Sequence, residues 1–178
     1  MTLMIRESGG LRFTENLVLS GGLSVRDTAD GVPELEGSYV PGVKGMMSAN
    51  VAVSANVATA IPFNQESFDD DNFHSTSTNP SRFTVSAGRS GKYLVTAHVV
   101  FTDAAESARI VQIRQSGTTI VAEGALVEAG NGTTVEVNTV LALSAGAYLE
   151  VVVTSGAAVS VCGGGVRFTT FTMVRLGA

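Results

Sequence analysis

Residues 82–99 read RFTVSAGRSGKYLVTAHV: a phenylalanine, a glycine-containing turn and then a long alternating segment. From Tyr93 to Phe101 every second residue is apolar, and polar side chains such as Lys92 and Thr96 stand on the other positions. Side chains two residues apart in a strand lie on the same face. The pattern therefore predicts a β-strand that buries one face.

The same period of two continues through the rest of the chain. Residues 135–143 and 148–154 alternate on either side of the turn at 144–147, and we expect them to form a hairpin. Residues 109–114 and 119–122 flank the turn QSGT, which predicts a second hairpin. About eight short strands with regular turn signals are typical of an all-β sandwich or jelly roll.

The last predicted strand, 166–176, carries apolar side chains on both faces. Phe168 and Leu176 lie on one face, and Phe171 and Met173 lie on the other. One face meets the core, so the other needs a cover. The sequence leaves open whether a neighbouring subunit or a loop of the same chain covers Phe171 and Met173.

Composition excludes several classes of protein. The chain has 178 residues, of which 44% are hydrophobic and 15% charged, with 20 glycines and a net charge of -5. This acidic, glycine-rich composition disfavours a helical bundle and a nucleic-acid-binding protein. Its apolar runs are too short to insert into a membrane, its first residues do not resemble a signal peptide, and its one cysteine cannot form an internal disulfide.

Residues 1–45 are predicted to be an N-terminal arm, and residues 46–178 the folded domain. Eight of the first 45 residues are glycine, and the tetrapeptide SGGL occurs at 8–11 and again at 20–23. So few bulky side chains cannot form a core alone, so we expect the arm to attach to a partner surface. The candidate attachment residues are its apolar side chains: Leu3, Ile5, Leu11, Phe13, Leu17 and Leu19.

Enzyme motifs are missing from the sequence. His74 and His98 are the only histidines, and no nucleophile motif, zinc motif or phosphate-binding loop accompanies them. We therefore predict a protein without enzymatic activity and without a cofactor.

The densest cluster of charge is acidic and consists of Glu66, Asp69, Asp70 and Asp71. A solvated loop that makes surface recognition contacts is the main interpretation. A weak calcium site is the alternative, because Ca²⁺ accepts several oxygen ligands from flexible loops.

The signature of Phe83, Gly91, Tyr93 and the strand through His98 resembles the centre of C1q/TNF-like domains. The resemblance covers roughly residues 46–178 in the order of that family. It implies a C1q/TNF-like jelly roll that assembles as a homotrimer, with its first and last strands near the threefold axis. The interface residues expected on this basis are Phe168, Phe171, Met173 and His98.

With Asn79-Pro80-Ser81-Arg82 ahead of the signature, the chain also resembles domains encoded by tailed bacteriophages. The resemblance implies a virion structural protein, assembled in the host cytoplasm. We expect a capsid decoration or head fibre whose arm binds the major capsid protein or another virion protein. The alternative is a tail-tip or baseplate adhesin that recognises a host-surface glycan. The absence of heptads for a shaft favours the decoration.

Overall fold

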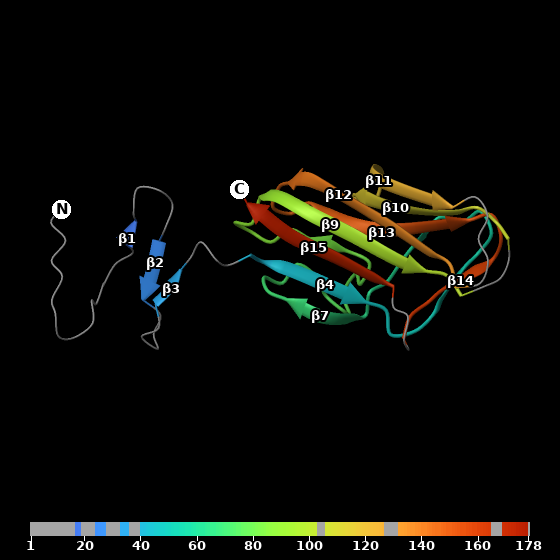
Figure 1. The fold of residues 1–178 in the computed structure, drawn as a ribbon, viewed down its shortest axis with the longest axis horizontal. Helices are drawn as coiled ribbons and strands as arrows, with labels where there is room; N and C mark the ends of the chain where they lie inside the picture. Colours follow the sequence, from blue (N-terminus) through green and yellow to red (C-terminus); the bar gives the residue numbers. More distant parts are fainter. Residues whose placement is uncertain are drawn as a thin grey trace. The chain divides into compact units, whose positions relative to one another are not determined.

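The computed structural model describes residues 17–18, 24–27, 33–35, 40–102, 106–126, 132–164 and 169–177. All the regular elements in these ranges are β-strands (Figure 1). The chain divides into two units, Met1–Val40 and Pro41–Ala178. In the first unit, β1 (Leu17–Val18), β2 (Ser24–Asp27) and β3 (Pro33–Leu35) form a small antiparallel sheet in that order.

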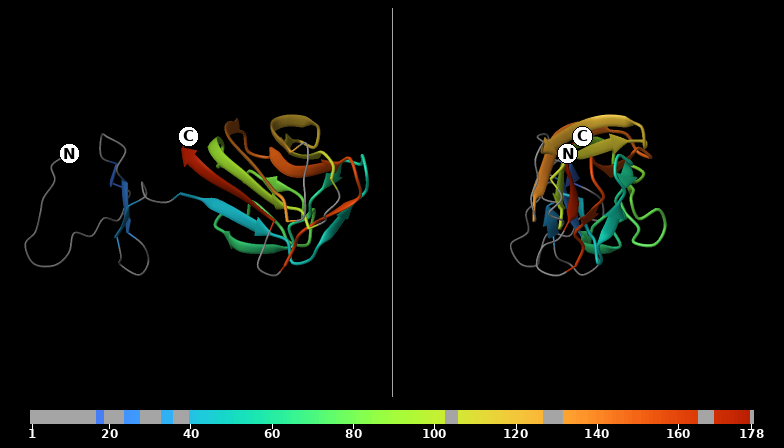
Figure 2. Two further views of the ribbon diagram at one scale, coloured as in Figure 1. Left: turned by 45° about the vertical axis from the view of Figure 1, so that its right-hand side comes forward. Right: turned by 90° about the vertical axis from the view of Figure 1, so that its right-hand side faces the viewer.

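The second unit, which we call the sandwich unit, contains two five-stranded sheets (Figure 2). The first sheet has the order β12 (Thr134–Leu143), β9 (Gly91–Val100), β15 (Thr170–Gly177), β4 (Gly42–Met46) and β7 (Gln65–Asp69). The second has the order β11 (Thr119–Leu126), β10 (Arg109–Gln115), β13 (Tyr148–Ser155) and β6 (Thr59–Ala60), and β8 (Phe83–Thr84) also pairs with β13. A two-stranded sheet joins β14 (Val159–Val161) to β5 (Val51–Val53).

The boundary between the units lies before Pro41, five residues earlier than the predicted end of the arm. The segment 40–45 has the composition of a linker, yet β4 pairs with β15 on one side and β7 on the other. Its glycines mark close approaches rather than flexibility. A Cβ on Gly45 would lie 2.5 Å from Cζ of Phe83 and 3.0 Å from Cβ of Phe63, so only glycine fits there.

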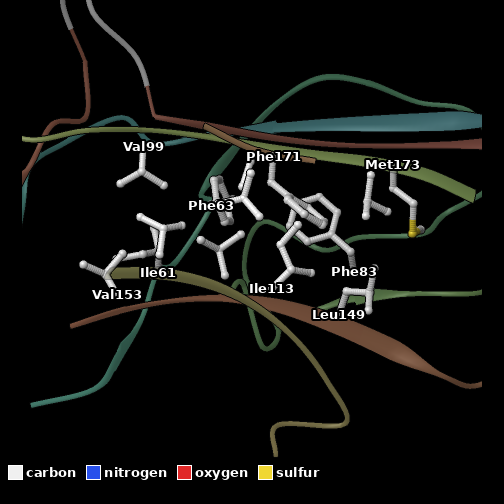
Figure 3. Close-up of a cluster of buried hydrophobic side chains, with 14 of the residues drawn as sticks. Ile61, Phe63, Phe83, Val99, Ile113, Leu149, Val153, Phe171 and Met173 are labelled. Atoms are coloured by element: carbon white, nitrogen blue, oxygen red, sulfur yellow. The ribbon is translucent and has the colours of Figure 1, made fainter. Parts of the chain in front are cut away.

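The core lies between the two sheets. Figure 3 shows Val99, Phe171 and Met173 of the first sheet pointing toward Leu149 and Val153 of the second. The predicted buried face of β9 is confirmed, because Tyr93 and every second residue as far as Phe101 are fully buried. Burial raises the pKa of the Tyr93 hydroxyl.

An aromatic cluster joins the two sheets through Phe83. Its ring centroid lies 5.4 Å from that of Phe63 and 4.7 Å from that of Phe171, in edge-to-face contacts. The imidazole of His74 stacks on Phe83, with 4.2 Å between the ring centroids. Phe83 therefore contacts residues from three separate parts of the chain.

One predicted hairpin is confirmed and the other is wrong. Strands β10 and β11 pair around a turn in which Ser116 and Gly117 adopt φ of 53° and 79°. By contrast, β12 pairs with β9 and β13 pairs with β10, so these consecutive strands belong to different sheets. Alternation predicts which face of a strand is buried, but both sheets bury a face against the same core, so it does not tell which sheet a strand joins.

We predict that Gly45→Ala lowers the free energy of unfolding by about 1–3 kcal/mol, because the new methyl group overlaps the buried ring of Phe83. Chemical denaturation monitored by circular dichroism measures this change. Gly156→Ala is the matched control, since its Cβ would meet no atom closer than 3.5 Å. Equal stability of the two variants would contradict the close contact at Gly45.

Candidate functional site

The outer face of the first sheet carries a row of apolar residues across all five strands. Directly paired residues of antiparallel strands lie on the same face. Val140 of β12 pairs with Leu94 of β9, and Leu94 pairs with Val174 of β15. Val174 pairs with Gly42 of β4, and a Cβ on this glycine would lie 3.3 Å from both Val174 and Phe68 of β7. We call these five residues the outer stripe.

The outer stripe is accessible to solvent in the single subunit. The exposed fractions are 55% for Val140, 40% for Leu94 and 41% for Phe68, and Leu176 near the end of β15 is 55% exposed. Half of the large hydrophobic residues that are exposed within the described ranges therefore lie on this face or at its edge. The solvent face of an antiparallel sheet is normally polar, and a contiguous apolar patch marks an interaction surface.

The rows next to the outer stripe are polar, and each contains a lysine. Asn138, Thr96, Thr172 and Lys44 form the row on one side, and Ala142 pairs with Lys92 on the other. One row further on, Nδ1 of His98 lies 3.0 Å from Oε1 of Glu136, and both side chains are exposed. This face therefore combines an apolar centre with a polar border, as protein interfaces do.

The outer face of the second sheet has a different character. Gln112 donates a hydrogen bond from Nε2 to Oε2 of Glu123, and Arg114 donates from Nε to Oε1 of Gln112 at 2.9 Å. The isolated exposed apolar residue Ile120 lies beside Arg114 in the register. Hydrogen-bonded polar side chains thus occupy the outer face of the second sheet, where the first sheet has the outer stripe. The first sheet is therefore the better candidate for assembly.

The predicted interface residues lie in different places. Phe171 and Met173 are completely buried between the sheets of one subunit, so the prediction that they contact a neighbouring subunit is wrong. The hydrophobic core of the same subunit covers Phe171 and Met173. The outward-facing apolar residues of β15 are Val174 and Leu176. His98 lies on the outer face of the first sheet, and Phe168 lies outside the described residues.

Sequence reasoning missed most of the outer stripe, although a signal was present. Leu94 and Val140 are apolar residues at positions that strict alternation assigns to the solvent face. Each stands next to a residue that fits the pattern, so the strand as a whole still seemed regular. When two paired strands each have an apolar residue at a position that alternation assigns to the solvent face, these residues indicate a second buried surface.

The predicted acidic loop is partly a strand, because Glu66 and Asp69 belong to β7 and only Asp70 and Asp71 follow it. The four carboxylates hold this segment in place. Asp69 accepts hydrogen bonds from the backbone N–H groups of Phe73 and His74, at 2.9 and 3.0 Å. Asp70 accepts one from the N–H of Gly42 at 3.0 Å, which attaches the loop to β4. Asp71 pairs with Arg89, whose Nε lies 2.8 Å from Oδ2.

The fourth carboxylate, that of Glu66, lies 2.7 Å from Nδ1 of His74. Glu66 and Asp69 both contact His74, through its ring and its backbone N–H, whereas Asp70 and Asp71 contact Gly42 and Arg89. Among the described residues, no group of three or more His, Cys, Asp or Glu side chains is placed to hold a metal ion. The carboxylates therefore have structural partners, and the recognition contacts expected of this acidic cluster stay a prediction.

Most of the predicted attachment residues lie outside the described part of the chain. These are Leu3, Ile5, Leu11, Phe13 and Leu19. Leu17 belongs to β1, which pairs with β2. Within the described ranges, the chain has no helix long and apolar enough to cross a membrane.

No protein-family model and no curated protein sequence matches the chain. Solved structures do match its fold. Murine APRIL at pH 8.0 gives a TM-score of 0.58 at 14% identity, covering 78% of this chain and 100% of that one. The globular domain of the zebrafish complement 1qA protein gives 0.57 at 13% identity, covering 76% and 97%. Eiger TNF from S. frugiperda gives 0.50 at 15% identity, covering 77% and 94%. The fold is therefore an all-β jelly roll of the C1q/TNF type.

We predict that Asp69→Asn lowers the free energy of unfolding by about 1.5–3 kcal/mol, because one charged acceptor becomes an N–H donor that faces a backbone N–H group. Thermal and chemical denaturation measure the loss. Glu106→Gln is the control, since Glu106 is exposed and forms no hydrogen bond or ion pair within the described residues. If both variants unfold like the wild type, the capping role of Asp69 is wrong.

We also predict that EDTA leaves the melting temperature of the wild type unchanged. Three of the four carboxylates already have N–H or guanidinium partners, and the fourth lies beside His74. A specific ion present at 100 times its dissociation constant would add about 2.7 kcal/mol. A marked fall in melting temperature with EDTA, reversed by Ca²⁺, would contradict this prediction.

Proposed function

We propose that the chain is a non-enzymatic structural protein of a bacteriophage virion. The sandwich unit forms a homotrimer through the outer face of the first sheet. The residues before Pro41 attach the trimer to the major capsid protein or another virion protein, as a capsid decoration or head fibre. The protein is assembled in the host cytoplasm and stays on the particle.

The outer stripe is the observation that carries the assembly proposal. Val140, Leu94 and Val174 lie side by side on three paired strands, and Phe68 extends the apolar surface to the edge strand. Burying such a patch removes apolar area from water at about 25 cal/mol per Å². A second copy is a fitting partner because the polar border contains charges of both signs, Lys44 and Lys92 beside the stripe and Glu136 beyond it, so identical faces need not repel one another. The jelly-roll fold and the sequence resemblance support three copies.

The environment of the histidines supports a role without catalysis. The side chain of His74 is fully buried, and its ring nitrogens lie 2.7 Å from Oε1 of Glu66 and 3.0 Å from the carbonyl oxygen of Pro80. His98 contacts Glu136 on an open sheet face. Within the described residues, neither ring forms a hydrogen bond with a serine, threonine or cysteine, and the partners of both rings are carboxylates or a backbone carbonyl.

The proposal of a virion location rests on the sequence. The segment Asn79-Pro80-Ser81-Arg82 resembles phage-encoded domains of this fold, and the sequence contains neither heptads nor a long repeat that would form a shaft. In the structure this segment is a turn, closed by the hydrogen bond from the N–H of Arg82 to the carbonyl of Asn79 at 2.9 Å. Its carbonyl at Pro80 also accepts from the N–H of Phe63 at 2.7 Å.

A second candidate function is a tail-tip or baseplate adhesin for a host-surface glycan. One observation favours it: a polar surface pocket lies beside Arg82 and Tyr148, apart from the outer stripe. The genes next to that of this protein distinguish the two candidates, since capsid genes favour a decoration and tail genes favour an adhesin.

We predict that the full chain sediments as a trimer and that Val140→Glu converts it to a monomer. A carboxylate within an apolar interface loses its hydration without gaining a partner. Sedimentation velocity at micromolar concentration measures the state. Circular dichroism checks that the variant keeps its β structure, which we expect because Val140 is 55% exposed in the subunit.

Ile120→Glu is the matched control for that experiment. Ile120 is 50% exposed, similar to Val140, but lies on the second sheet, so the variant should remain a trimer. A wild type that is monomeric at micromolar concentration would overturn the assembly proposal. A trimeric Val140→Glu variant would show that the first sheet is not the interface.

We predict that a chain lacking residues 1–40 still folds and assembles but does not bind to particles that lack the native protein. The deletion ends before Pro41 because β4 belongs to the sandwich unit, and a longer deletion would remove a central strand. Electron microscopy of particles mixed with each form of the protein measures attachment. If the shortened chain decorates particles as well as the full chain does, the sandwich unit itself contains the attachment surface.

A further inference from the structure

A surface pocket of about 250 Å³ lies between the loop after β7 and the start of β13. Its lining includes Asn72, Asn79, Arg82, Thr84 and Tyr148. Neither the outer stripe nor any of the four acidic residues contributes to the lining. In a chain with a net charge of -5, this pocket therefore presents no carboxylate to a ligand.

The guanidinium of Arg82 is held in place from one side. Its Nε donates to Oε1 of Glu150 at 3.2 Å, and its Cζ lies 4.5 Å from the centre of the Tyr148 ring. Ser81 donates to the same carboxylate oxygen at 3.1 Å. The Glu150 side chain is only 10% exposed, whereas that of Arg82 is 42% exposed. The two Nη groups make no hydrogen bond within the described residues, so they remain donors for a ligand.

Neutral polar groups surround this guanidinium. The side chains of Asn72, Asn79 and Thr84 are exposed and make no hydrogen bond in the described part of the chain. Asn72 and Asn79 adopt left-handed backbone conformations, with φ of 55° and 51°. Amides and hydroxyls both donate and accept, so together they match a ligand with several neighbouring hydroxyl groups.

We propose that this pocket binds one neutral sugar residue of a glycan. Glu150 already balances the charge of Arg82, which disfavours a preference for anions. The absence of carboxylates from the lining disfavours cations, and the polar lining disfavours apolar ligands. The pocket is smaller than the roughly 300–1,000 Å³ sites that enclose drug-sized ligands, so it accommodates a single ring.

The inference deepens the adhesin candidate and does not depend on the trimer. A chain that assembles but binds no sugar overturns the sugar pocket alone. A chain that binds sugar as a monomer overturns the assembly proposal alone. The same protein sample answers both questions, because sedimentation and ligand titration use the full chain.

The test is an amide NMR titration of the nitrogen-labelled full chain with galactose, glucose, mannose and N-acetylglucosamine in turn. Each is raised to roughly 50 mM, since contacts of this size give millimolar dissociation constants. We expect at least one sugar to produce saturable shifts confined to the pocket residues. Glycerol and glucuronate, titrated in parallel, separate sugar recognition from binding of any polyol or any carboxylate.

Two variants remove ligand contacts without disturbing the fold. Asn79→Gly keeps a residue that tolerates positive φ, and Thr84→Val keeps the branched shape at an exposed strand position. We expect each to weaken sugar binding at least fivefold. Asn56→Gly is the matched control, because Asn56 also has a positive φ, of 59°, but lies outside the pocket, and it should leave binding unchanged.

Three results would overturn the inference. The first is that none of the four sugars saturates. The second is that glycerol or glucuronate shifts the same residues with equal affinity, which would indicate unselective binding or an anion site. The third is that the double variant Asn79→Gly with Thr84→Val binds as tightly as the Asn56→Gly control.

Discussion

The close contact between Gly45 and Phe83 is the constraint on which the two-sheet arrangement depends. Gly45 belongs to β4 of the first sheet and Phe83 to β8, which pairs with β13 of the second. The ring of Phe83 occupies the space that any Cβ at position 45 would need, and it also contacts Phe63 and Phe171. Because interiors are packed as densely as organic crystals, this one interdigitation fixes the distance between the sheets at that point. The register of β4 with β15, and so the continuity of the outer stripe, follows from where Gly45 lies.

The sequence could predict the strands and their buried faces, because alternation depends only on the local geometry of the chain. The face of β9 from Tyr93 to Phe101 is the clearest case. Three properties could not be predicted, because they depend on contacts between distant residues. Strands β12 and β13 joined different sheets, β4 proved to be part of the sandwich unit, and the core side of β15 was decided by its register with β9. A strand with two apolar faces provides no local evidence of which face lies inside.

The candidate sites illustrate the same limit for charged residues. A run of three aspartates predicts repulsion relieved by water or a cation, if only their spacing is known. In the fold every one of these carboxylates is hydrogen-bonded or ion-paired, and the partners of Asp70 and Asp71 are 28 and 18 residues away in the chain. The pocket beside Arg82 could not be predicted either, because the Arg82 guanidinium is oriented by Glu150, which lies 68 residues further along the chain. Tertiary structure decides whether such groups stabilise a loop or remain free for a ligand.

The two sheets offer different chemistry to their surroundings, which makes assembly and ligand binding compatible. The outer stripe lies on the first sheet, whereas Thr84 and Tyr148 of the pocket belong to strands of the second. An interface that covers the stripe therefore need not cover the pocket. In a trimer the pocket would occur three times on one rigid body, and multivalent attachment raises the strength of binding to a dense surface by roughly 10²–10⁴ without any new contact. Millimolar affinity for a single sugar is then sufficient for adhesion to a glycan-coated cell. A decoration and an adhesin would accordingly differ in where the N-terminal residues attach them, and the sandwich unit could be the same in both.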